Sequence, residues 1–133
     1  MTAMADVLEN AVLDLVLNNV PLSTAGISTG TIFAALFVTP TDDTGGGVEV
    51  MGGSYSRSTV SSFSVPVGGT TSNSVNVTFP NASANWGIVT HFALYDASTG
   101  GNMLFHGALT SPKIINAGDS FVLPVGNITI SMD

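Results

Sequence analysis

Apolar residues recur at helical spacing near the start of the chain, over residues 4–17. One side of a helix formed by this segment would carry Met4, Leu8, Ala11, Val12 and Leu15, and the opposite side Asp6, Asn10 and Asp14. Asp6 followed by Glu9 predicts a capping box at the start of this helix. The helix should end at three residues that disfavour its continuation, Asn18, Asn19 and Pro21.

A second apolar strip follows the same spacing on a neighbouring side of the helix and comprises Leu13, Val16, Leu17 and Val20. This strip widens the face that we expect to be buried, either on the rest of the chain or on a neighbouring subunit. The candidate contact residues of the helix are Leu8, Val12 and Leu15.

After a connector at residues 22–30, the pattern changes to short runs of period two, separated by Gly, Pro, Asn and Asp. The expected strands lie at residues 31–39, 55–65, 72–79, 87–95, 102–109, 113–115, 121–123 and 127–132. Residues 40–53 form a long loop with three consecutive glycines. We therefore predict a mainly β fold, an antiparallel β-sandwich or jelly-roll-like barrel of about seven to eight strands preceded by one N-terminal α-helix. The predicted parts are a helix at 1–20 and a single β-rich domain at 21–133.

The strands at 87–95 and 102–109 flank a turn at 96–101, which predicts a hairpin. Pairing Tyr95 with Asn102 would place Phe92 opposite Phe105 on one apolar face.

The same register places His91 opposite His106 on the other face of the hairpin. Two imidazoles about 5 Å apart at Cβ would begin a metal site. A third ligand is needed, and by alternation no acid falls on that face. A polar pair at a subunit interface is therefore the favoured interpretation, and protonation near pH 6.5 would then make assembly sensitive to mild acid.

Charged residues make up only 8% of the chain and apolar residues 44%, whereas soluble domains carry roughly a quarter charged residues. A surface of Ser, Thr, Asn and Gly with so few charges indicates extensive contact with other protein molecules. The net charge is −7, with Arg57 and Lys113 as the fixed cations, so we expect no nucleic-acid partner. The sequence holds no membrane span and no signal peptide, which predicts a soluble protein made in the cytoplasm.

Candidate chemistry is sparse. The chain has no Cys, which excludes thiolate nucleophiles and Cys-based zinc sites. Asp42 and Asp43 lie beside the glycine run but lack the spacing of a calcium loop, so a solvated loop tip is favoured over an ion site at a subunit junction. Arg57 is expected to pair with a buried or interfacial acid. The sequence contains no recognisable set of catalytic residues, so we expect neither an enzyme nor a cofactor.

Trp86, with Tyr55 and Tyr95, would offer a stacking platform for a sugar. Trp86 also stands at the start of a strand, where an aromatic ring commonly closes the end of a sandwich. A core or interface position is the favoured interpretation, and Trp86, Asp42 and Asp43 are kept as candidate receptor contacts.

Four segments resemble a family of small tailed-phage virion proteins that commonly carry the label phage tail fibre protein. They are GGSYSR at 52–57, WGIVTHFALYD at 86–96, GGNMLFHGAL at 100–109 and PKIINAGD at 112–119. The resemblance covers most of the chain. It implies a non-enzymatic structural role on the head or tail of a virion, with no catalytic residue to transfer.

Three functions stay open at this point. A compact chain without fibre repeats favours capsid decoration, in which a homotrimer bridges copies of the major capsid protein through surface contacts that include the helix, His91, His106 and Arg57. The first alternative is a tail fibre, fibre-base or minor tail protein that contacts the host and other tail proteins. The second is a carbohydrate-binding module, which would depend on Trp86.

Overall fold

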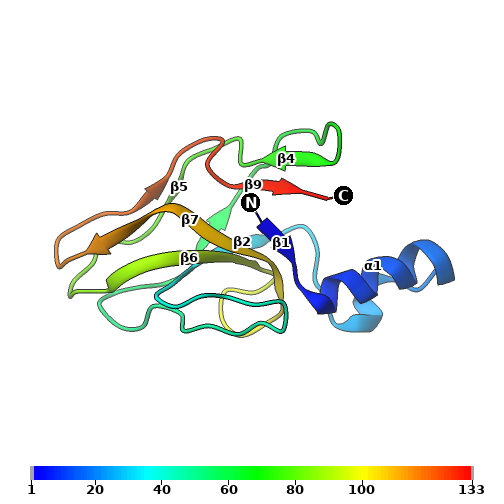
Figure 1. Cartoon of the computed structure of the whole chain (residues 1–133), viewed down its shortest axis with the longest axis horizontal. Coiled ribbons are helices and arrows are strands. Elements are labelled where there is room, and N and C mark those ends of the chain that lie inside the picture. Colours follow the sequence, from blue (N-terminus) through cyan, green and yellow to red (C-terminus); the bar gives the residue numbers. More distant parts are fainter. Residues whose placement is uncertain (1, 133) are drawn as a thin grey trace.

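A computed structural model describes residues 2–132 of the chain. Within that range lie one α-helix, one 3-10 helix and nine strands (Figure 1). The helices are α1 (Asp6–Asn18) and η1 (Leu22–Ala25), and the strands are β1 (Thr2–Met4), β2 (Ile32–Phe37), β3 (Ser58–Val60), β4 (Thr70–Ser72), β5 (Val77–Thr78), β6 (Gly87–Tyr95), β7 (Met103–Ile115), β8 (Val122–Leu123) and β9 (Thr129–Ser131). The prediction of a mainly β fold behind one α-helix is confirmed.

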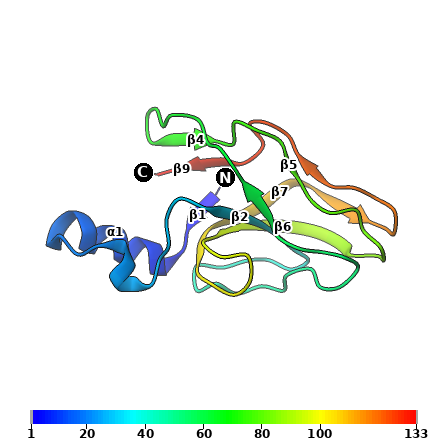
Figure 2. The ribbon, with the colours of Figure 1, turned by 180° about the vertical axis from the view of Figure 1, so that it is seen from behind.

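The strands form two layers. The main sheet has five strands in the order β1-β7-β6-β2-β3, and its pairs are antiparallel. Two short antiparallel pairs, β4 with β9 and β5 with β8, lie over one face of this sheet, while α1 projects from one end of the molecule (Figures 1 and 2). The result is a sandwich-like arrangement with more strands than expected, because β1 was not expected and the segment expected as one strand at 72–79 contributes to two, β4 and β5.

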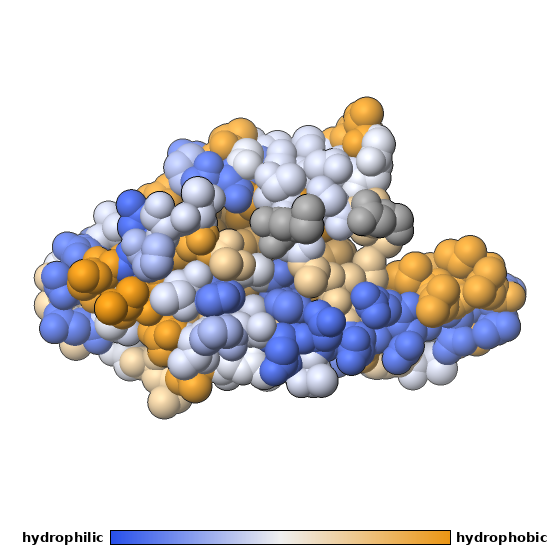
Figure 3. Space-filling view, viewed as in Figure 1, coloured by the Kyte–Doolittle hydropathy of each residue, from blue (hydrophilic) through white to orange (hydrophobic). Residues whose placement is uncertain are grey.

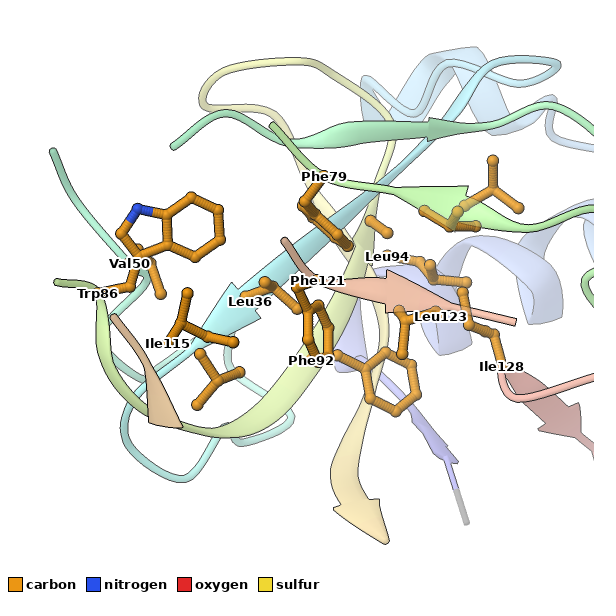
Figure 4. Close-up of a cluster of buried hydrophobic side chains, with 14 of the residues drawn as sticks. Leu36, Val50, Phe79, Trp86, Phe92, Leu94, Ile115, Phe121, Leu123 and Ile128 are labelled. Atoms are coloured by element: carbon orange, nitrogen blue, oxygen red, sulfur yellow. The ribbon is translucent and has the colours of Figure 1, made fainter. Parts of the chain in front are cut away.

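The main core lies between these two layers (Figure 4). Leu36, Phe92 and Leu94 of the main sheet face the aromatic and aliphatic side chains of the second layer, among them Phe79, Phe121, Leu123 and Ile128. The Phe79 and Phe121 rings are 5.8 Å apart between centroids. Since burial of one such side chain contributes roughly 1.5–3 kcal/mol, this core supplies most of the driving force for closing the two layers.

The hairpin of β6 and β7 differs from the predicted register. Phe92 pairs with Gly107, and Phe105 pairs with Leu94. The predicted register is wrong because the pairing shifts between Leu94 and Tyr95, where β7 contains one extra residue. The pairing shifts again between Val89 and His91, and beyond this point β7 continues to pair with β6 as far as Ile115. Residues 113–115, expected as a separate strand, are therefore the end of β7.

The two histidines consequently do not face each other. His91 pairs with Ala108, and His106 pairs with Ala93 of β6 and Ala3 of β1. The proposed paired-imidazole site is absent from this hairpin. Among residues 2–132, no group of three or more metal-ligating side chains is placed to hold a metal ion.

The start of α1 is fixed by backbone contacts and not by the predicted capping box. The N-cap is Ala5, whose side chain has no polar group, and Asp6 lies inside the helix. The Asp6 N–H donates to the carbonyl of Asp43 at 2.9 Å, and the Ala5 N–H donates to that of Leu104 at 2.9 Å. The sequence pattern did not predict β1, which pairs with β7 and ends just before Ala5, the N-cap of α1. The predicted end of the helix is confirmed, since Asn19 adopts the left-handed conformation with φ of 55°.

Candidate interaction surface

The free end of α1 presents an apolar strip to solvent. Leu13, Val16 and Leu17 are 57%, 72% and 73% exposed, and Leu15 is 41% exposed. Figure 3 shows this apolar surface gathered at the end of the helix that projects from the molecule. The prediction that the second strip is buried is therefore wrong within one chain, which leaves the neighbouring subunit as its expected cover. We call Leu13, Val16 and Leu17, which share one side of the helix, the helix strip; Leu15 lies on another side.

The root of α1, in contrast, is held firmly on the domain. Leu8 and Ala11 are buried against Ile27 and Leu104. Leu8 is thus a core residue and not the contact residue that was expected, and Val12 is half-buried beside it. Because the root is packed and the strip is exposed, the helix holds its apolar end in a fixed position away from the sheet.

The 3-10 segment that follows α1 is tied to the hairpin turn through Asp96. The Asp96 carboxylate accepts hydrogen bonds from the backbone N–H groups of Ser28 at 3.0 Å and Asn102 at 2.7 Å. The Asn102 side-chain amide donates to the carbonyl of Gly26 at 3.0 Å. Burial alone would raise the pKa of Asp96, but the hydrogen bonds from Asn102 and Ser28 outweigh it and lower this pKa. The chain is therefore anchored to the domain at the start of α1 and again just after η1, at Gly26 and Ser28.

His106 connects β7 to the loop that supports the helix. Its Nδ1 lies 2.9 Å from Thr41 Oγ1, and its Nε2 lies 2.8 Å from Asp43 Oδ1. The backbone of Asp43 also accepts the Asp6 N–H of α1. Asp43 thus links the buried imidazole to the start of α1. Sequence analysis favoured a solvated loop tip for this residue, and the contacts of Asp43 differ from that expectation. His91 is half-buried and lies 2.8 Å from Thr90 Oγ1 through its Nδ1.

Asp42 organises its own turn. One carboxylate oxygen accepts hydrogen bonds from the Thr44 hydroxyl at 2.6 Å, the Thr44 N–H at 3.0 Å and the Gly46 N–H at 2.9 Å. The Thr44 hydroxyl, followed by the Gly46 N–H, lowers the pKa of this exposed carboxyl. The three consecutive glycines allow the tight loop that these bonds close.

Arg57 is the centre of a polar network on the other face of the main sheet. Its guanidinium forms a bidentate pair with Glu49, with distances of 3.0 and 2.9 Å. The same group donates to the carbonyls of Ala97 and Gly100 and lies 3.7 Å from the ring centroid of Tyr95. Burial would lower the pKa of Arg57, but the hydrogen bonds and charge of Glu49 raise it. The expected acidic partner of Arg57 is therefore Glu49, a residue of the same chain.

Trp86 is buried, with 5% of its surface exposed. The indole N–H donates to the carbonyl of Gly53 at 2.9 Å, and the ring meets Tyr55 edge-on with centroids 5.3 Å apart. The Tyr55 hydroxyl donates to Glu49, and burial followed by this hydrogen bond raises the pKa of the phenol. Within one chain the indole face is covered by core, so it is not presented to a ligand.

A groove of about 420 Å³ opens next to the helix root, between the main sheet and the β4–β9 pair. Its apolar lining includes Ile32, Phe63, Leu104, Phe105, Ile130 and Met132. Leu104 contributes both to this lining and to the packing of α1. The groove therefore adjoins the root of α1, and the helix strip lies at the free end of the same helix. Sequence reasoning found the strip by its spacing, but the groove has no signal in the sequence because its residues come from distant segments.

The comparison with known families addresses the identity of the chain. A family model described as Podophage GP4 fiber I protein gp80 matches residues 3–131. No curated protein matches the chain. No helix within the described residues has the length and apolar character needed to cross a membrane. The family match spans both α1 and the β layers and agrees with the resemblance to tail-fibre proteins. The chain therefore belongs to the family of the Podophage GP4 fiber I protein gp80, a family of phage fibre proteins.

Proposed function

We propose that this chain is a non-catalytic structural subunit of the phage tail-fibre apparatus, which works by holding other virion proteins through the exposed end of α1. The observation that carries the proposal is the unpartnered helix strip on a chain whose family is a fibre family. Exposed apolar patches on a rigid support are typical of protein–protein contact sites. The partners are other proteins of the virion.

The fibre role is preferred over the capsid decoration that the short, repeat-free sequence favours. The matching family is described as a fibre protein, which supports this preference, and a compact domain fits a fibre base or an adaptor as well as it fits a head surface. The chain need not form the shaft itself, because a sandwich-like domain with a projecting helix serves to join longer components.

The polar residues of the chain support a structural role. Arg57, His106 and Asp96 each hold loops or the helix in place through hydrogen bonds to other parts of the chain. These side chains bind other groups of the same chain, and the resulting hydrogen bonds hold the helix strip in position. A receptor contact by Trp86 would require exposure of an indole that is buried here.

Loss of the chain from the particle is expected to damage the tail and leave the head intact. We expect phage that carry a stop codon in this gene, grown in a non-suppressing host, to package DNA normally. Negative-stain images should show incomplete fibres, and adsorption should fall at least about tenfold, since fibre contacts supply the binding energy that holds the particle on the cell. Growth in a host that supplies the intact chain should restore both.

Two outcomes of this experiment would contradict the fibre role. One is a complete set of fibres with unchanged adsorption. The other is heads that burst on mild heating while the tails stay intact, which is the behaviour expected for lost decoration.

A further inference from the structure

Three apolar features lie on the same end of the molecule. They are the helix strip, the groove beside the helix root, and the exposed Val65 and Val67 in the segment before β4, which are 83% and 78% exposed. Figure 3 shows apolar surface at the free end of α1 and at the tip above it. The groove meets α1 at its root through Leu104, and the helix strip lies farther along the same helix.

We propose that the helix strip of one copy of this chain lies in the groove of a second copy. A surface that carries a ridge next to a matching hollow is self-complementary, because a two-fold axis places each ridge in the hollow of the partner. If the contact relates neighbouring copies by 120° and not by 180°, it closes a trimer in place of a dimer. This inference deepens the proposed function by naming a partner, and it is tested on the purified chain alone.

The distribution of charge favours a second copy as the occupant. The groove lining contains no charged residue among those described, so neither an acidic nor a basic segment finds a counter-ion there. The helix strip itself holds no charged residue. Glu9 lies one turn before Leu13 on the same side of the helix and is exposed, and the exposed Asp14 accepts a hydrogen bond from Asn18. Neutral apolar surface therefore meets neutral apolar surface, with no buried charge left unpaired.

The size of a stable interface also requires more surface than the helix strip alone provides. A stable interface removes roughly 800 Å² from each partner and involves about 20–30 residues a side. The three residues of the helix strip fall far below this size. The groove adds twelve lining residues, and Val65 and Val67 add exposed apolar surface, so a reciprocal contact uses each of these surfaces once on every copy.

The first test is the solution mass of the purified chain, measured by light scattering over a dilution series. We expect a closed dimer or trimer. The paired change Leu13→Gln with Leu17→Gln should weaken association at least about 100-fold while helix content by circular dichroism is kept, since Gln is a good helix former. The matched control, Ile114→Gln with Val125→Gln, removes two exposed apolar residues elsewhere and should leave the mass unchanged. A single-chain mass for the natural sequence, or an unchanged mass for the helix variant, overturns the proposal.

The second test identifies the contact itself and exploits the absence of Cys. Copies with Leu17→Cys are mixed with copies with Met132→Cys and treated with a short bis-maleimide. Cross-links between positions 17 and 132 of different copies should dominate, and copies with Val125→Cys should give none with position 17. Cross-links only between two copies of position 17 would mean that the helices pair with each other outside the groove, which contradicts the proposed contact.

Discussion

Replacing Phe79 with alanine is expected to lower the free energy of unfolding by about 3–5 kcal/mol. Phe79 is 2% exposed and stands where the second layer meets the main sheet. Its ring lies 6.4 Å from that of Tyr55 and 5.8 Å from that of Phe121. Truncation removes the transfer energy of the ring and leaves a cavity that its aromatic neighbours fill only in part.

This expectation is checked by urea unfolding monitored by circular dichroism. Because domains of this size have only about 5–15 kcal/mol of stability, the alanine variant could be partly unfolded, so Phe79→Leu supplies a milder second point with an expected loss of about 1–2 kcal/mol. Val125→Ala, at a residue that is 56% exposed and lies outside the proposed contact between copies, is the control and should change stability by less than about 0.5 kcal/mol. A loss below about 1 kcal/mol for Phe79→Ala would contradict the two-layer core.

Replacing Arg57 with glutamine is expected to cost about 3 kcal/mol, because it leaves the Glu49 carboxylate without its cation in a largely covered site. The side chains of Arg57 and Glu49 are only 8% and 23% exposed. The change also removes the two hydrogen bonds to the carbonyls of Ala97 and Gly100 and the contact with the Tyr95 ring. The hairpin turn should therefore loosen together with the loop that carries Glu49.

A double-mutant cycle separates these contributions. Adding Glu49→Gln to Arg57→Gln removes the unpaired charge, so the double variant should be less destabilised than the sum of the two single variants. Lys113→Gln removes the other fixed cation of the chain, which is exposed, and should be nearly neutral. Strictly additive single changes would show that the pair does not act as a unit.

The strand pattern predicts the fold where apolar residues alternate or cluster without interruption. The run at 31–39 contains β2, and the segment 87–95 matches the bounds of β6, because both strands are covered by packed side chains. The pattern fails at β1, where three residues before a helix are too few to show a period. It also fails at the bulges of the β6–β7 hairpin, since pairing register depends on hydrogen bonds made by Asp96 and Asn102 that spacing does not reveal.

The interaction surface could be predicted only in part, for a related reason. The spacing of Leu13, Val16 and Leu17 identifies an apolar strip, but apolar periodicity is the same whether a strip meets its own core or another chain. Their exposure becomes clear only when the neighbouring Leu8 and Ala11 are seen to occupy the available core. The link from His106 to Asp43 joins residues 63 positions apart and has no local signal.

The position of the chain on the intact virion tests the account most directly. An antibody fragment or a small tag on an exposed turn at the end of the molecule opposite α1, such as the turn after β7 at Gly118, can be located by electron microscopy and its copies counted. The fibre role predicts a small number of labels at the tail, at the bases or along the length of the fibres. Many labels spread over the head with none at the tail would contradict it.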